Sequence, residues 1–169
     1  EGDTVLVPAG NCVWTATIFV SSKAIIIQGA GIDNTVITDS TTAAYERNAL
    51  LVNNPEGKSV RITGLTFKGG IGPEGIIQIK GGTKNFRIDH IKFDNPTTRS
   101  IWISGYTYGV IDSNIWNVTQ NATIQGLSVI ADGDDAWNRE LTLGSSNAVY
   151  VEDNTFNYSY LNDGALDAY

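Results

Sequence analysis

Short apolar segments alternate with polar, turn-forming residues along almost the whole chain, and hardly any stretch keeps the 3.6-residue periodicity of a helix. Four segments share one pattern, in which an aliphatic residue is followed five positions later by an aromatic residue. They are 62–67, 88–93, 111–116 and 151–156, and their first residues lie 26, 23 and 40 positions apart. A β-rich repeat of about 23 residues is typical of a solenoid, in which each repeat forms one coil.

The spacing favours stacked coils over a β-sandwich. A sandwich needs hairpins, and the two Asp-Gly pairs that occur, at 132–133 and 163–164, do not lie between alternating strands of equal length. In a coil, each strand pairs in parallel with its equivalent about 4.8 Å away, so like residues stack on like. The aromatic ladder that we expect consists of Phe67, Phe93, Trp116 and Phe156.

Two further columns are expected from the same alignment. An aliphatic column should contain Leu65, Ile91 and Ile115. A column of asparagines should lie just beyond the aromatic ladder, because asparagine tolerates the left-handed backbone of a sharp turn and can bond to the next coil. Its expected members are Asn95, Asn117 and Asn157.

Four segments, 76–80, 100–104, 126–130 and 165–169, are assigned to one sheet. Strand alternation divides each of them into an inward and an outward set. The residues expected to face inward are Ile77, Ile79, Ile101, Ile103, Leu127, Val129, Leu166 and Ala168. The residues expected to face outward are Gln78, Lys80, Trp102, Ser104, Ser128, Ile130, Asp167 and Tyr169. The long interval before the last repeat holds an extra segment, 131–146, which we expect to leave the coil as an inserted loop.

Composition narrows the classes of function. A chain of 169 residues is normally one domain, and this one carries 17% charged residues with a net charge of −7. An acidic chain without a basic patch is a poor partner for nucleic acid, and no apolar run reaches the ~18 residues of a membrane span. Cys12 is the only cysteine, which excludes an internal disulfide and a cysteine metal cluster.

The opening segment 2–10 (GDTVLVPAG), followed by 25–31 (IIIQGAG) and 35–37 (TVI), resembles the first coils of the pectin-lyase-like superfamily, and 85–93 resembles its later repeats. The resemblance spans Gly2 to Tyr169 and implies an all-β, right-handed parallel β-helix of five to six coils. It also implies a secreted or cell-surface protein, a polysaccharide partner, and further coils or self-association at both open ends. The superfamily contains polysaccharide lyases, polygalacturonases and tailspikes, so its fold does not specify one activity.

The resemblance places a polysaccharide across the outer face of one sheet, where aromatic rings support sugars and planar polar groups bind hydroxyls. Trp102 is the principal candidate, and the alternative is that the inserted loop covers it as a small local core. The other candidate binding residues are Tyr106, Tyr108, Gln78, Lys80 and Trp137.

Lyases of this superfamily use Ca²⁺ and a basic residue, and the metal acidifies the proton next to a uronate carboxylate. Asp132, Asp134 and Asp135 are the candidate Ca²⁺ ligands, although such a cluster also suits a solvated loop. The candidate bases are Lys80, Arg99 and Arg139, and a simple ion pair is the alternative for Arg139. The catalytic set is Asp134, Asp135, Arg139 and Asp167.

His90 is the only histidine, and the Ile-Asp-His at 88–90 is similar to a motif of pectate lyases in which Trp precedes it; here Arg87 stands there. A role in catalysis competes with contact to solvent or to the neighbouring coil. The Gly-His-Gly motif of polygalacturonases is absent. Two hypotheses therefore stay open: a lyase or hydrolase acting on an acidic glycan, or a non-catalytic structural, adhesin or fibre-type solenoid with a glycan-binding face.

Overall fold

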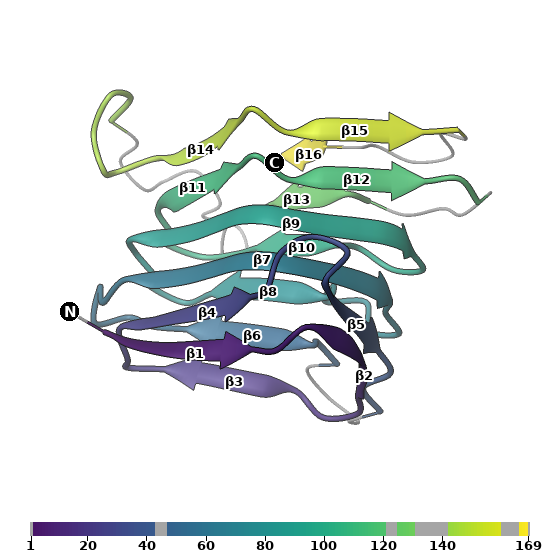
Figure 1. Cartoon of the computed structure of the whole chain (residues 1–169). Coiled ribbons are helices and arrows are strands. Elements are labelled where there is room, and N and C mark those ends of the chain that lie inside the picture. The colour runs from purple at the N-terminus through teal and green to yellow at the C-terminus, as the bar shows by residue number, and fades with distance from the viewer. Residues whose placement is uncertain (1, 43–46, 121–124, 131–141, 160–165, 169) are drawn as a thin grey trace.

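The computed structural model describes residues 2–42, 47–120, 125–130, 142–159 and 166–168. These residues form sixteen β-strands and no helix, and all strand pairs are parallel (Figure 1). The strands stack as a β-solenoid of about five turns, as the repeats predicted. None of the described residues belongs to a helix that is long and apolar enough to cross a bilayer.

The strands form two hydrogen-bonded sheets, of ten and six strands. A bend divides the ten-stranded sheet into two faces, which we call the first and the second sheet, and the six-stranded sheet is the third. The first sheet contains β1 (Asp3–Val7), β4 (Ile25–Gly29), β7 (Val60–Gly69), β9 (Phe86–Pro96), β11 (Gly109–Asp112) and β14 (Val149–Glu152). The second contains β2 (Gly10–Trp14), β5 (Thr35–Asp39), the later halves of β7 and β9, β12 (Ile115–Val118) and β15 (Thr155–Tyr158). The third contains β3 (Ile18–Ser21), β6 (Leu50–Asn53), β8 (Ile77–Lys80), β10 (Ile101–Ile103), β13 (Leu127–Val129) and β16 (Leu166–Ala168).

The coil is right-handed. In Figure 1 most strands of the first two sheets, β7, β9, β12 and β15 among them, run from left to right across the front, the third sheet returns behind them, and the chain climbs with each turn. This is the hand expected of a crossover between parallel strands, because strands with a right-handed twist pack back onto a sheet in only one sense.

The aromatic ladder predicted from the repeats is confirmed. Phe67 and Phe93 have ring centroids 6.1 Å apart, Phe93 and Trp116 are 5.1 Å apart, and Trp116 and Phe156 are 4.5 Å apart. All three pairs are stacked, and Trp14 of the first coil extends the ladder with an edge contact to Phe67. The rings of Phe67, Phe93 and Trp116 are fully buried, so the ladder forms the axis of the core.

The prediction of the aliphatic column is only partly correct. Leu65 aligns with Ile91, but Ile115 aligns with Lys92 and not with Ile91. Asn114 bonds at the interior position instead: its Oδ1 accepts from the Ile91 backbone N–H at 2.9 Å, and its amide donates to the Ile88 carbonyl at 2.9 Å. Asn154 repeats this arrangement one coil later, by donating to the carbonyl of Ile111. An asparagine ladder, with Asn114 buried and Asn154 half-buried, thus ties successive coils together.

The expected turn column of asparagines is also half correct. Asn117 aligns with Asn157, but its partner in the preceding coil is Asp94 and not Asn95. Asn95 has a left-handed backbone with φ of 48°, and its side-chain oxygen accepts from the Thr119 backbone N–H at 2.8 Å. It therefore does bond to the next coil, from a position one residue beyond the aligned column.

The register of the third sheet is confirmed. Ile77, Ile101, Leu127 and Leu166 align in one column, and Gln78, Trp102, Ser128 and Asp167 align in the neighbouring column. Ile77, Ile101 and Leu127 are fully buried in the core. The alternation read from the sequence thus identifies which column faces the core.

A sharp bend joins the first sheet to the second, and in each of the four later coils one residue makes it. Gly64, His90, Ser113 and Asp153 all have a left-handed backbone, with φ between 51° and 70°. The bend lets a strand continue into the next sheet without a loop, which is why β7 and β9 belong to both sheets. Of the side chains at this bend, those of His90 and Asp153 are exposed and that of Ser113 is half-buried.

Candidate functional site

The candidate ligand face is the outward column of the third sheet. Gln78 and Ser128, the neighbours of Trp102 on the adjacent strands, are both buried, with Gln78 only 4% exposed. Leu51, which aligns with Gln78 in the preceding coil, is buried as well, and Trp102 is half-buried. This column is therefore not exposed to solvent along its whole length, and the accessible part of the face lies at its edge.

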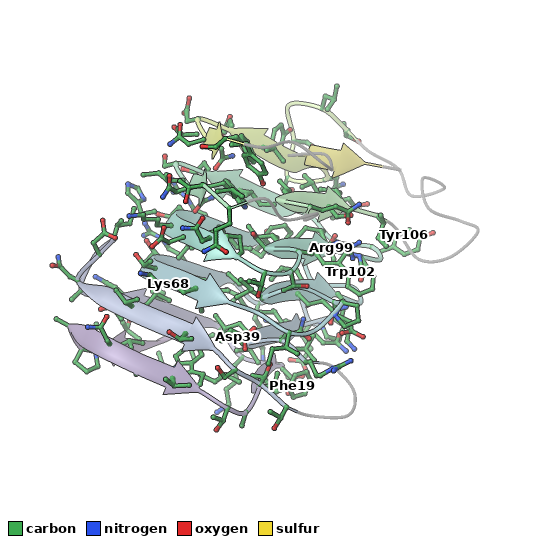
Figure 2. All side chains as sticks on the ribbon, turned by 90° about the vertical axis from the view of Figure 1, so that its right-hand side faces the viewer. Phe19, Asp39, Lys68, Arg99, Trp102 and Tyr106 are labelled. Carbon is green, nitrogen blue, oxygen red and sulfur yellow. The ribbon has the colours of Figure 1, made fainter. Side chains whose placement is uncertain are left out.

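Arg99 and Trp102 form that edge. The guanidinium carbon of Arg99 lies 5.0 Å from the centroid of the indole, within the range of a cation–π contact. Two hydrogen bonds position the guanidinium, from Nε to the Gln125 side-chain oxygen at 2.6 Å and from Nη1 to the Pro73 carbonyl at 3.3 Å. Tyr106, 45% exposed, lies in the turn after β10, and Figure 2 shows Arg99, Trp102 and Tyr106 along the same side of the solenoid.

Several buried polar atoms on this side have no hydrogen-bond partner among the residues that the structure describes. A buried polar atom without a partner costs about 1–3 kcal/mol, so such atoms are rare in native proteins and favour the binding of water or a ligand that supplies the missing bond. Around the third sheet these atoms are Gln78 Oε1, Ser100 Oγ, Trp102 Nε1 and Ser128 Oγ.

The remaining predicted site residues are spread more widely. Lys80 is half-buried at the end of β8, and Tyr108 is buried, with Lys84 Nζ 5.5 Å from the centroid of its ring. The backbone of Asp167 aligns with that of Ser128, in the column that contains Trp102. The rest of the predicted set, Asp132, Asp134, Asp135, Trp137 and Arg139, lies outside the described residues.

The candidate Ca²⁺ ligands belong to that undescribed set. Among the residues that the structure does describe, no group of three or more His, Cys, Asp or Glu side chains is placed to hold a metal ion. The calcium site therefore stays a prediction about Asp132, Asp134 and Asp135.

A charged cluster on the outer face of the first sheet was not predicted. Arg61 donates from Nε and Nη2 to the two carboxylate oxygens of Asp89, at 2.8 and 2.7 Å. One coil later, Arg87 makes the same two-bond pair with Asp112, at 2.9 and 2.8 Å. Each arginine thus reaches the acid on the neighbouring strand, and the paired bonds fix the geometry of both groups.

The Asp89 carboxylate also organises its surroundings. It is completely buried, accepts a hydrogen bond from the Thr63 hydroxyl at 3.1 Å, and lies 2.8 Å from Nδ1 of His90. Burial acts to raise the pKa of Asp89, but the hydrogen bonds from Arg61, His90 and Thr63 outweigh it, and the net pKa is lowered. Asp89 is therefore ionised at neutral pH.

One signal in the sequence marks this cluster. Arg61 and Arg87 occupy equivalent positions of two repeats, and Asp89 follows Arg87 by two residues, so both point to the same face of a strand. Each arginine bonds to an acid in the next coil, two residues beyond the position with which the arginine itself aligns. Predicting the pairs therefore requires both the register between coils and the alternation of side chains within a strand. The Ile-Asp-His motif contains two members of the group, Asp89 and His90, and neither of the arginines.

Comparisons with known proteins add no relative to this picture. The chain matches no protein-family model, no curated protein and no solved structure. The fold and the surface geometry of this chain are therefore the basis for its function.

Proposed function

We propose that this protein binds an acidic polysaccharide outside the cell, with the glycan lying along the Arg99–Trp102–Tyr106 edge of the third sheet. The supporting observation is the guanidinium of Arg99 held 5.0 Å from the indole of Trp102. Aromatic rings support the apolar face of a sugar, and a positioned guanidinium pairs with a uronate carboxylate. The combination suits a uronate better than a neutral sugar.

The repeat distance of the solenoid supports a polymeric ligand. Adjacent strands are about 4.8 Å apart, so side chains on successive coils recur at nearly the length of one sugar unit. Trp102 and Asp167 stand in one column, two strands apart. A chain of sugars along this edge would contact the accessible side chains beside the column, because Gln78 and Ser128 within it are buried.

A second candidate function is chemical modification of that glycan by a lyase or a hydrolase. The observation in its favour is the position of Asp167, whose backbone shares the column of Trp102. The pectin-lyase-like superfamily is the family that we propose for this chain, on the strength of the solenoid and of the opening 2–10 segment. The inserted segment would then supply the acids and the base.

Binding is tested by affinity electrophoresis through gels that contain polygalacturonate, alginate or dextran. The expected result is retardation by one of the uronate polymers and none by neutral dextran. Tyr106→Ala removes an exposed ring from the proposed edge and should weaken retardation severalfold. Leu6→Ala is the control, because it removes an exposed apolar side chain from β1 in the first sheet, outside the proposed edge.

Turnover is tested separately, by following new double bonds in the ultraviolet and new reducing ends, with and without Ca²⁺. A product that requires Asp167 would support the enzyme. Retardation without product would leave a binding protein, and migration unchanged in every gel would refute the proposal itself.

A further inference from the structure

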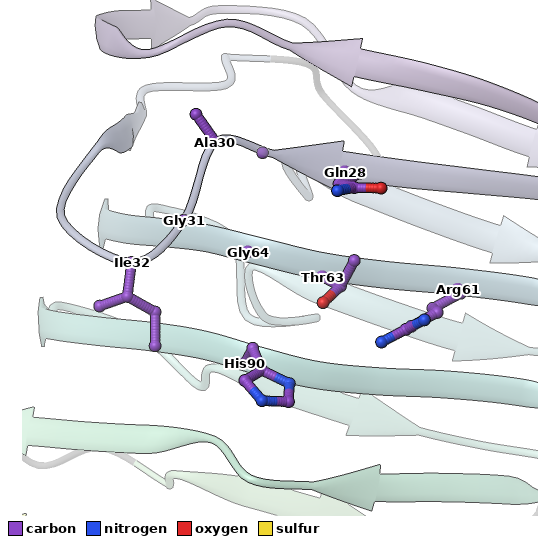
Figure 3. Close-up of a pocket in the computed structure, with 9 residues that line it drawn as sticks. Gln28, Ala30, Gly31, Ile32, Arg61, Thr63, Gly64 and His90 are labelled. Carbon is purple, nitrogen blue, oxygen red and sulfur yellow. The ribbon is translucent and has the colours of Figure 1, made fainter.

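A pocket lies on the first sheet, on a different face of the solenoid from Trp102. It has a volume of about 540 Å³ and opens to solvent between the segment that joins β4 to β5 and the bend of β7 and β9. Gln28, Thr63, Arg61 and His90 come from three successive strands, and Ile32 borders them from the joining segment (Figure 3). The pocket thus combines charged, polar and apolar groups.

Close backbone contacts shape one wall of this pocket. The Gly31 backbone N–H donates to the carbonyl of Gly64 at 3.0 Å, and the Asp33 N–H donates to the Thr66 hydroxyl at 2.9 Å. A Cβ on Gly29 would lie 2.2 Å from the Gly64 oxygen, so only glycine allows the two segments to approach so closely. The wall is therefore held in place without a ligand.

Asp89 fixes the hydrogen-bonding character of His90. An ionised carboxylate can only accept, so the ring nitrogen that faces it, Nδ1, carries the proton in the neutral imidazole. The other nitrogen, Nε2, is then an acceptor. The side chain of His90 is 59% exposed, so in its neutral form it offers a ligand hydroxyl a positioned acceptor.

Arg61 supplies the complementary donor. Its Nε and Nη2 bind Asp89, which leaves the Nη1 edge of a partly exposed guanidinium for a ligand. Within each of the pairs Arg61–Asp89 and Arg87–Asp112, the positive and the negative charge neutralise each other. Lys92 is paired with Asp33 beside the pocket. These pairs leave no excess positive charge around the pocket, so it suits at most one negative charge, held by hydrogen bonds to the guanidinium of Arg61.

We propose that this pocket binds a small hydroxy acid, with its single carboxylate against Arg61 and a hydroxyl donating to Nε2 of His90. The exposed amide of Gln28 contributes to the remaining hydroxyls, and Ile32 covers the apolar side of the carbon chain. The site is independent of the Trp102 edge, so either proposal can fail without the other.

The test uses the only histidine of the chain, whose ring signals in an NMR spectrum need no assignment. Gluconate is titrated into the whole protein, with glucose lacking the carboxylate and acetate lacking the hydroxyls as the matched probes. The expected result is a saturable shift of the His90 ring signals with gluconate, and half-saturation at least about tenfold higher with glucose or acetate. No shift with gluconate, or equal shifts with all three, would overturn the proposal.

Arg61→Lys is the decisive variant, and Arg87→Lys is its matched control. Both replace a two-bond arginine–aspartate pair on the same sheet, but Arg87 does not line the pocket. Arg61→Lys should weaken gluconate binding about tenfold and Arg87→Lys less than twofold. Equal weakening would show that the effect is structural and would refute the site. If Arg61→Lys does not fold, Gln28→Ala replaces it, with a severalfold weakening expected and unchanged binding counting against the site.

Discussion

The indole of Trp116 lies 4.5 Å from the phenyl ring of Phe156, with the two planes only 16° apart, although 40 residues separate them in the chain. The indole N–H also donates to the carbonyl of Gly126 at 3.2 Å. Trp116 therefore links β12 in the second sheet to the residue that precedes β13 in the third sheet.

Replacing Trp116 with alanine should lower the free energy of unfolding by about 3–5 kcal/mol, because it opens a cavity in a fully buried ladder. Trp116→Phe keeps a ring in the stack and should cost less. Phe19→Ala, at a side chain that is 57% exposed, is the control and should change little. Urea unfolding curves followed by circular dichroism measure all three. Equal values for Trp116→Ala and Phe19→Ala would contradict the ladder's role in stability.

Asn114→Ala tests the asparagine ladder. The change removes the partners of the Ile91 N–H and the Ile88 carbonyl, both inside the core, and each group left unpaired costs about 1–3 kcal/mol. We expect a clear loss of stability in the same urea assay, and little change for the control Asn11→Ala, at an exposed position of β2. A neutral Asn114→Ala would show that water replaces the amide.

Two buried aspartates should respond oppositely to pH. The pKa of Asp89 is lowered in the folded protein, so its stabilising contribution is present above the ordinary value of 3.8 and is lost as the pH falls through the lower folded value. Burial raises the pKa of Asp39 despite its hydrogen bonds with Thr41, so ionisation of Asp39 destabilises the fold and protonation relieves this. The difference in unfolding free energy between wild type and Asp89→Asn should be constant near neutral pH and should shrink as the pH falls below 3.8.

Asp39→Asn provides the comparison for that experiment. The wild type should gain on this variant as the pH falls, the reverse of the trend for Asp89→Asn. Parallel trends for the two variants would show that the acid response comes from other carboxylates.

Val110→Arg should extend the cross-coil ion pairs. Val110 aligns with Arg87, and Glu152 aligns with Asp112, so an arginine at 110 would face Glu152 as Arg87 faces Asp112. An exposed pair of this kind contributes about 0.2–1 kcal/mol. The gain should disappear in Val110→Arg combined with Glu152→Gln, and in high salt. A gain that survives both conditions would come from something other than the pair.

The stacking of the coils was predictable because identical residue types recur at one spacing and fill one column. Asn114 was misplaced in the sequence alignment because the neighbouring Ile115 offered a more apolar match, and a buried asparagine is favoured only once its backbone partners are known. The burial of Gln78 could not be foreseen, since alternation identifies an outward side chain and not what lies over it. The Arg61–Asp89 pair needed the register between coils as well as the alternation within a strand.

The bend between the first and second sheets has an evolutionary consequence. Its backbone shape is the same in coil after coil, yet its occupants are Gly64, His90, Ser113 and Asp153, four chemically different residues. Substitution at these four positions can therefore change the functional group that the bend presents while the fold stays the same.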